Sequence, residues 1–343
     1  MAEADPGIFA AAARVPEVSV ASRDALDAVL HSTTEPFIVR GLVSDWPLVQ
    51  AGLQSASAAR DYLLGHHRDA PFTVSVGPSS SGGRLFYDAN MAMNFQMLRA
   101  KLPEIFAKMA AGEQADQAPA IYLGSIDIPE FFPTLSADNP MPMGERDCLA
   151  SIWIGTQTRI AAHNDVPRNL ACVAAGHRRF TLFPREQFRN LYLGPIDNTP
   201  AGRAVSMVDF HAPDFARFPR FRDALATAQV AEMAPGDALY IPPLWWHHVE
   251  GLDRFNILVN YWWRDAPRWL GQPQDALNHA ILAIRDLPQD ERAYWRDLFD
   301  YYVFGADEGV TAHIPAEGQS VLAPLTAESA ARIRGFLLRQ LSR

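Results

Sequence analysis

Two short motifs in the sequence carry side chains that bind metal ions. His163 and Asp165 end an apolar run, TRIAAHND, and residues two apart on an extended strand point to the same face. A third ligand is expected from a second run, LYIPPLWWHHVEG, at either His247 or His248, where aromatic neighbours would shield the site from water. Two histidines and one carboxylate are the ligand set of non-heme Fe(II) enzymes, which keep positions open for a co-substrate and O₂.

The first motif on its own has a simpler explanation, in which the His163 ring bonds to a backbone carbonyl and Asp165 caps a turn. The second motif makes this simpler explanation less favourable than a metal site, because it supplies another histidine after a GDALYIP turn and before a further strand. Together the two motifs favour a metal centre.

Short apolar runs in the middle of the chain are the elements that would hold these motifs. Most are bounded by Gly, Pro, Asn or Asp, and they include AIYLGSI, LASIWIG, NLACVAAG, RRFTLF and FNILVNYWW. This pattern predicts strands that form a sandwich or a closed barrel over residues 119–265. A long insert rich in Pro and Phe, residues 185–235, shows no strand pattern and is expected to be a lid or a binding wall.

The two flanking regions are expected to be largely helical. Residues 1–118 should supply helices and strands that pack on the barrel, among them one helix over residues 94–112 with a break near Pro103. Three amphipathic stretches predict a helical tail over residues 266–343. The expected fold class is therefore mainly β with helical additions, namely N-terminal α/β elements and a C-terminal helical tail.

Composition narrows the classes of function. Hydrophobic residues make up 48% of the 343 residues, which is enough for a sizeable core, and the net charge of −9 argues against a general nucleic-acid binder. The two cysteines, Cys148 and Cys172, cannot form a disulfide framework and suit a reducing compartment. Since no signal peptide or membrane-spanning stretch is recognised, we expect a cytoplasmic protein with no membrane partner.

The order of the motifs resembles the cupin-like JmjC family, most closely its branch of asparaginyl hydroxylases. The similarity covers about residues 34–265 and rests on the ordered set His163-Asn164-Asp165, Asn169, Gly176-His177-Arg178, Phe183-Pro184, the run PGDALYIP, Trp245-Trp246-His247-His248 and Asn260-Tyr261-Trp262. The ordered set is specific, whereas any single motif would be weak.

The resemblance implies a double-stranded β-helix, also called a jelly roll, that holds Fe(II) and 2-oxoglutarate. Its metal ligands would be His163, Asp165 and His247, with His248 pointing away. Arg178 would hold the far carboxylate of 2-oxoglutarate. Four further residues match positions that line the co-substrate or substrate pocket: Tyr122, Asn169, Asn260 and Trp262.

The sequence departs from the family pattern at two positions. Arg178 stands where the family usually has a lysine, and Ile160 stands where it often has the Ser or Thr that bonds the same carboxylate. Either another hydroxyl, for which Tyr122 is the candidate, takes over that role, or the affinity for 2-oxoglutarate is lower. Strand alternation turns Arg178 inward, where a charge needs a partner, so its partner is either 2-oxoglutarate or an internal acidic residue that would make it structural.

The expected activity is a 2-oxoglutarate-dependent hydroxylation of a protein side chain or a small molecule, with demethylation through an N-methyl group as the alternative outcome. Two other interpretations stay open: a cupin-like binding protein that has lost turnover, and a cupin enzyme that does not use 2-oxoglutarate. The resemblance also implies a homodimer through residues within 270–343, unless these helices pack on their own barrel. No nucleic-acid partner is expected.

Overall fold

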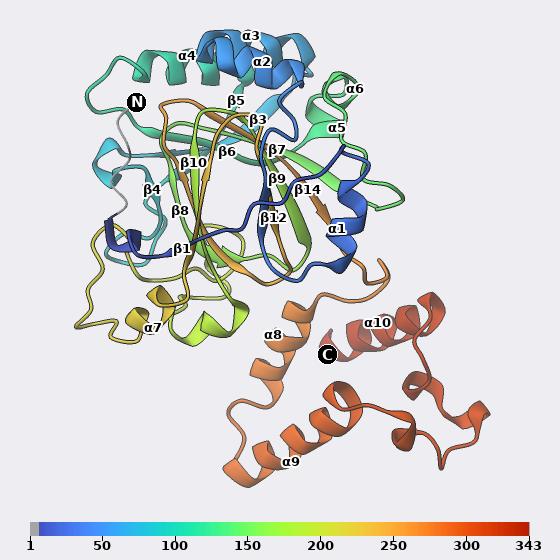
Figure 1. Cartoon of the computed structure of the whole chain (residues 1–343). Coiled ribbons are helices and arrows are strands. Elements are labelled where there is room, and N and C mark those ends of the chain that lie inside the picture. Colours follow the sequence, from blue (N-terminus) through green and yellow to red (C-terminus); the bar gives the residue numbers. More distant parts are fainter. Residues whose placement is uncertain (1–6, 343) are drawn as a thin grey trace. The chain divides into compact units, whose positions relative to one another are not determined.

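The computed structural model describes residues 7–342. Its strands form two sheets, which Figure 1 shows, and side chains that alternate along these strands give the sheets a shared interior. The six-stranded sheet contains, in spatial order, β1 (Ala13–Arg14), β11 (Gln229–Met233), β10 (Arg178–Phe183), β13 (Trp246–Gly251), β8 (Arg159–Asn164) and β4 (Arg84–Leu85). The eight-stranded sheet contains β2 (Phe37–Val39), β12 (Ala238–Ile241), β9 (Arg168–Ala175), β14 (Asn256–Trp263), β7 (Leu149–Gly155), β6 (Ala120–Asp127), β3 (Pro71–Gly77) and β5 (Gln96–Lys101).

The interior between the sheets has an apolar part and a polar part. Phe180 and Val249 of the six-stranded sheet pack against Leu239 and Leu258 of the eight-stranded sheet. This arrangement is a jelly roll with helical additions, which confirms the fold class expected from the sequence. The first six residues of the chain lie outside the described residues.

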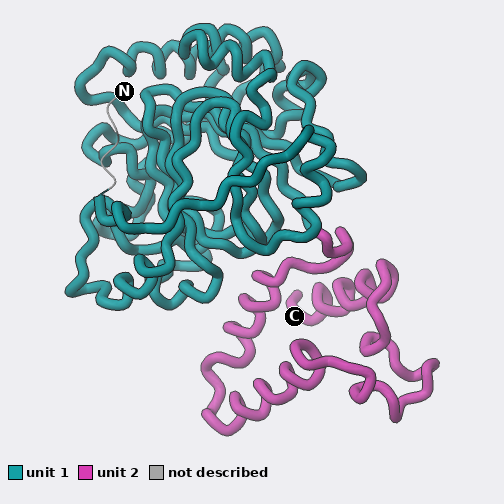
Figure 2. The backbone as a smooth tube through the Cα atoms, in the orientation of Figure 1, with its two compact units in different colours: residues 1–264 teal, residues 265–343 magenta. Residues whose placement is uncertain are grey.

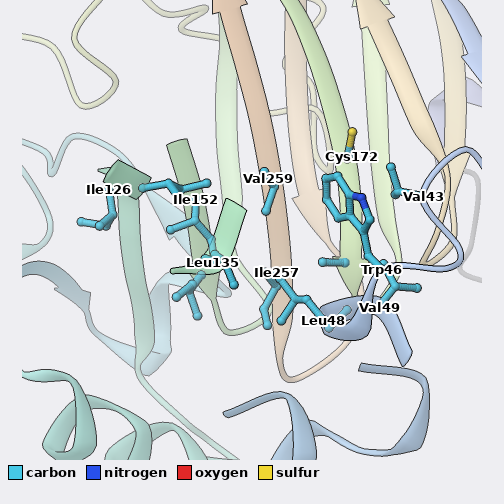
Figure 3. Close-up of a cluster of buried hydrophobic side chains, with 14 of the residues drawn as sticks. Val43, Trp46, Leu48, Val49, Ile126, Leu135, Ile152, Cys172, Ile257 and Val259 are labelled. Carbon is cyan, nitrogen blue, oxygen red and sulfur yellow. The ribbon is translucent and has the colours of Figure 1, made fainter. Parts of the chain in front are cut away.

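Helices cover the outer face of the eight-stranded sheet. They are α1 (Leu26–Ser32), α2 (Pro47–Gln54), α3 (Ala56–His66), α4 (Leu102–Gly112), α5 (Ile128–Phe131) and α6 (Leu135–Asp138), whereas α7 (Phe221–Leu225) lies in the insert. Figure 3 shows how Trp46, Leu48 and Val49, at the start of α2, meet Ile257 and Val259 of β14 in one buried cluster. Burial of these side chains fixes which face of β14 points outward, so its even-numbered residues point into the interior.

The region from residue 94 to 112 differs from the expected helix. Residues Gln96–Lys101 form strand β5, and only Leu102–Gly112 form helix α4. Pro103 lies in the first turn of α4, where its missing N–H costs nothing, so it begins the helix instead of breaking it. The expectation was wrong for residues 96–101 because pairing with β3 decides their conformation.

The insert covers the outer face of the six-stranded sheet. Leu191, Phe210, Phe218 and Phe221 pack there against Phe183 of β10. The expectation that residues 185–235 lack strands was wrong at one place, since β11 (Gln229–Met233) pairs with β10. The rest of the insert is loops, a short 3₁₀ segment at Arg185–Arg189 and helix α7.

The chain divides into two compact units, residues 1–264 and 265–343 (Figure 2). The second unit consists of α8 (Pro273–Ala283), α9 (Gln289–Phe299), a π-helical turn at Asp300–Phe304 and α10 (Ala327–Leu341), with short 3₁₀ turns between the last two. Cys148 and Cys172 are both free. Within residues 7–342, none of the helices combines the length and the apolar character that a membrane span requires.

A pair of glycines tests how closely α2 packs on the sheet. A Cβ added at Gly52 would lie 2.4 Å from the carbonyl oxygen of Ala174 on β9, whereas one added at Gly65 of α3 meets nothing within 4 Å. We therefore expect Gly52→Ala to lower the free energy of unfolding by about 1–3 kcal/mol, and Gly65→Ala to raise it by about 0.5 kcal/mol. Urea unfolding of both variants measures the difference, and equal effects would contradict this packing.

Candidate functional site

The pairing of β8 with β13 brings two histidines face to face. His163 and His247 are direct cross-strand partners, and their ring centroids lie 4.4 Å apart. Asp165 follows β8, and one carboxylate oxygen lies 3.5 Å from Nε2 of His247. One ligand atom from each of these three residues lies within 4.8 Å of the other two. The structure thus brings together the three side chains that the two sequence motifs supply.

Backbone carbonyls orient both imidazole rings. Nδ1 of His163 lies 2.9 Å from the carbonyl oxygen of Ala161, and Nδ1 of His247 lies 3.1 Å from that of Trp245. A carbonyl oxygen only accepts, so each Nδ1 carries the hydrogen and each Nε2 keeps its lone pair. A hydrogen bond of this kind selects the tautomer that binds metal through Nε2.

Burial and charge set the protonation states that metal binding needs. Burial, with the neighbouring His247, lowers the pKa of His163 to about 4, so this ring is neutral at pH 7. Burial acts to raise the pKa of Asp165, but the interaction with the neighbouring His247 side chain outweighs it and brings the pKa to about 2. A neutral imidazole and an ionised carboxylate are ready to donate electron pairs.

His248 points to the opposite side of β13. Its ring packs on Phe210 of the insert at 4.7 Å between centroids, and its Nδ1 lies 3.7 Å from a carboxylate oxygen of Glu250. The imidazole of His211 contacts the same carboxylate. The second candidate ligand is therefore directed away from Asp165, and His211 of the insert is a partner of Glu250.

A cavity of about 280 Å³ opens beside the three side chains. The residues expected to hold the metal or to line the co-substrate and substrate pocket all line this one cavity: Tyr122, His163, Asp165, Asn169, Arg178, His247, Asn260 and Trp262. Ile160 also lines it, so an apolar side chain stands where a hydroxyl was looked for. The cavity is half-enclosed by the two sheets and is large enough for a small organic acid beside a metal ion.

Arg178 is a buried cation without an acidic partner. Its side chain is 2% exposed, and no Asp or Glu among residues 7–342 forms an ion pair with it. Nη2 donates to the carbonyl oxygen of Trp153 at 3.4 Å, and Nε has no acceptor among the described residues. Burial lowers the pKa of Arg178 to about 10, against the opposing effect of Tyr122, so it remains charged at pH 7. Such a group is stabilised by an anion.

A chain of hydrogen bonds holds the polar wall of the cavity. Nε1 of Trp153 donates to Oδ1 of Asn260 at 2.7 Å, and Nδ2 of Asn260 donates to Oδ1 of Asn169 at 3.1 Å. The ring of Trp262 packs edge-on against Trp153, and its own buried Nε1 has no acceptor among the described residues. The wall therefore contains one buried donor that the described residues leave without an acceptor.

Sequence reasoning missed several residues of this cavity, among them three polar or hydrogen-bonding ones. Trp153 of β7 anchors the hydrogen-bond chain, and Thr73 and Ser75 of β3 line the opening. The signal for Thr73 and Ser75 was their alternation with Phe72 and Val74, which are buried on the helix side of the same strand. For Trp153 the sequence contains no comparable signal, because an aromatic residue in an apolar run usually belongs to the core.

The arrangement has the chemistry of an iron centre. Two histidines and one carboxylate on neighbouring strands occupy one side of a metal ion and match non-heme Fe(II) better than a structural Zn²⁺ site, which is closed by four protein ligands. The open side faces the cavity that contains the unpaired Arg178. The donor set and the orphaned cation therefore fit a metal with an anionic co-ligand.

Comparisons with known proteins agree with this geometry. The cupin-like domain family matches residues 24–268. The human protein named HSPB1-associated protein 1 is 29% identical over 155 residues, which is 42% of this chain and 30% of that protein. Lysine-specific demethylase JMJ31 of Arabidopsis thaliana is 32% identical over 119 residues, which is 34% of this chain and 21% of that protein.

A third relative is matched over a longer segment. The tRNA wybutosine-synthesizing protein 5 of Danio rerio is 30% identical over 206 residues, which is 56% of this chain and 58% of that protein. In all three relatives the matched part is less than two thirds of the relative's own length.

Replacing the three side chains one at a time tests the metal centre. We expect His163→Ala, Asp165→Ala and His247→Ala each to lose stoichiometric binding of Mn(II), because two remaining ligands hold a divalent ion weakly. The side chain of His248 faces the insert, so the His248→Gln variant should bind Mn(II) as the wild-type protein does. Equilibrium dialysis with Mn(II) measures this, and a loss confined to His248→Gln would mean that the ligand assignment is off by one residue.

Proposed function

The chain belongs to the cupin-like domain family, which confirms the resemblance drawn from its motifs, and from that premise we propose that it is an Fe(II)- and 2-oxoglutarate-dependent oxygenase. The relatives named as demethylases support an oxygenase-type enzyme. The two alternatives, a binding protein without turnover and a cupin enzyme without 2-oxoglutarate, have no comparable support.

One observation carries the proposal: the cavity that contains the side chains of His163, Asp165 and His247 also contains the unpaired Arg178. An internal acidic partner would have made Arg178 structural, and the described residues supply none. A dicarboxylate would bind both the metal and Arg178, since one carboxylate reaches the metal and the other forms a forked pair with the guanidinium.

Each residue has a defined task in this proposal. His163, Asp165 and His247 hold the metal, and Arg178 binds the far carboxylate of 2-oxoglutarate. Burial raises the pKa of Tyr122 to about 12, so its hydroxyl stays protonated and serves as the donor that Ile160 cannot be. Fe(II) with 2-oxoglutarate supplies the oxidising chemistry that inserts one oxygen atom of O₂ into a substrate C–H bond. The apolar walls exclude water, and the Asn169–Asn260 pair positions the ligands.

A protein side chain is the proposed substrate, and hydroxylation is the proposed outcome. Relatives named as lysine-specific demethylases support a substrate of this class, and in that chemistry hydroxylation of an N-methyl group releases the methyl carbon. The chain's net charge of −9 is unfavourable for a nucleic-acid substrate, although one relative is named for tRNA wybutosine synthesis. The free cysteines are in keeping with the cytoplasm.

Variants of two adjacent arginines test the role of Arg178. Arg178→Ala should abolish measurable 2-oxoglutarate binding and succinate release while Mn(II) binding persists, and Arg178→Lys should weaken 2-oxoglutarate about tenfold through loss of one charged hydrogen bond. Arg179→Lys is the matched control, since Arg179 faces the other side of β10 and pairs with Glu232 at 2.6 Å. Unchanged 2-oxoglutarate affinity in Arg178→Ala, measured by calorimetry, would refute the assignment.

We also propose that the second unit, within residues 270–343, makes a homodimer. Among its described residues only Val310, Ser329 and Ala330 are buried, while large apolar side chains such as Leu282 and Phe304 are 76% and 77% exposed. So little burial within the unit cannot hold three amphipathic helices in place in water. A second copy of the unit would cover them.

Charge inserted into the second unit tests the dimer. Light scattering of the wild-type protein should give twice the 38.0 kDa mass of the chain, and Phe304→Glu with Leu338→Glu should give a monomer. Leu53→Glu on α2, where the leucine is 58% exposed, is the matched control and should leave the mass unchanged. A monomeric wild-type protein at micromolar concentration would rule the dimer out and favour helices that pack on their own barrel.

A further inference from the structure

Strand β5 is an open edge of the eight-stranded sheet. Among the described residues it pairs with β3 alone, next to which it lies in Figure 1. Five of its six residues are exposed. Met97 is 67% exposed and yet lines the cavity that contains the metal-binding side chains. An exposed edge that runs directly from a reactive cavity is a template for another strand.

Backbone hydrogen bonds show which groups of β5 point outward. The N–H and C=O of Ile121 on β6 both bond to Thr156, on the β7 side. Because these directions alternate along a strand, Tyr122 bonds toward β3, to its partner Ser75. The N–H and C=O of Ser75 therefore point toward β6 and not toward β5. Met97 lies opposite Ser75, so its own N–H and C=O point away from the sheet. The same holds for Arg99, two residues on.

Side chains on this edge face the cavity in the same alternation. Met97 and Arg99 lie opposite Ser75 and Thr73, which line the cavity, whereas Ala100 lies opposite Phe72 and packs against the helix-side core. Residues opposite each other on neighbouring strands share a face. A segment added to β5 would therefore direct the side chain opposite Met97 toward the cavity.

Charge defines the segment further. Lys101 pairs with Asp69 at 3.0 Å, but Arg99 has no acidic partner among residues 7–342. The residue of an added strand that lies opposite Arg99 is two positions from the residue opposite Met97 and shares its face. An acidic side chain at that position would pair with the guanidinium.

We propose that β5 is the docking edge for an extended segment of the substrate protein, which adds as a further strand, directs one side chain into the cavity and places an acidic side chain against Arg99. The proposal rests on the proposed oxygenase function and deepens it by naming how the substrate is held. Main-chain bonds to Met97 and Arg99 would supply affinity, and the cavity and Arg99 would supply specificity.

A degenerate library of 12-residue peptides, applied to protein loaded with Mn(II) and 2-oxoglutarate, provides the probe. Bound peptides should carry Asp or Glu two positions from a common residue, and Arg99→Glu should remove that preference. Met97→Pro deletes an outward N–H at an edge position that tolerates proline, and it should weaken a selected peptide about three- to tenfold more than Met97→Ala does. Leu98→Ala, on the helix side of β5, is the control and should bind as the wild type does.

Methylation of the peptide's own amides makes the test independent of protein folding. Wild-type protein should bind a peptide less tightly when an amide opposite Met97 or Arg99 is N-methylated. Equal binding of Met97→Pro and Met97→Ala together with no effect of methylation would overturn the proposal. Selection of sequences from a random RNA pool and none from the peptides would also overturn it. Failure of the wild-type protein to bind Mn(II) and 2-oxoglutarate would instead refute the proposed function.

Discussion

The pairing of β8 with β13 is the constraint on which the whole site depends. His163 pairs with His247, but Ile160 pairs with Val249, so β8 spans three residues where β13 spans two. The extra residue in β8 is a bulge, and it is the reason that Ile160 and His163, three apart, both point inward. A uniform strand would have turned His163 away from His247, and a slip of one residue in β13 would have exchanged His247 for His248.

The second constraint is electrostatic. Two imidazole rings, an ionised carboxylate and a buried guanidinium share one small cavity, and the described residues give that guanidinium no acidic partner. A free buried charge lowers stability, so its retention indicates that a ligand supplies the partner. The hydrogen-bonded chain Trp153–Asn260–Asn169 already satisfies these side chains of the neighbouring wall, whereas Nε of Arg178 and Nε1 of Trp262 have no acceptor among the described residues.

The central part of this account could be predicted from the sequence, because the spacing of His163 and Asp165 and the WWHH motif express strand alternation directly. Arg178 could be placed inward for the same reason. Strand β5 could not be predicted, because the residues MLRAK favour a helix by their sequence and form a strand through pairing with β3. The partnership of His211 with Glu250 and the hydrogen bond of Trp153 also depend on contacts between segments far apart in the chain. Propensity and spacing carry no information about such contacts.

The central claim is that one cavity holds a metal on His163, Asp165 and His247 and a dicarboxylate on Arg178. A crystal structure of the protein grown without oxygen in Mn(II) and 2-oxoglutarate tests it most directly. The account predicts the ion bound to Nε2 of both histidines and to the Asp165 carboxylate, with the far carboxylate of 2-oxoglutarate in a forked pair with Arg178. Mn(II) bound by other residues, or 2-oxoglutarate bound away from Arg178, would contradict it.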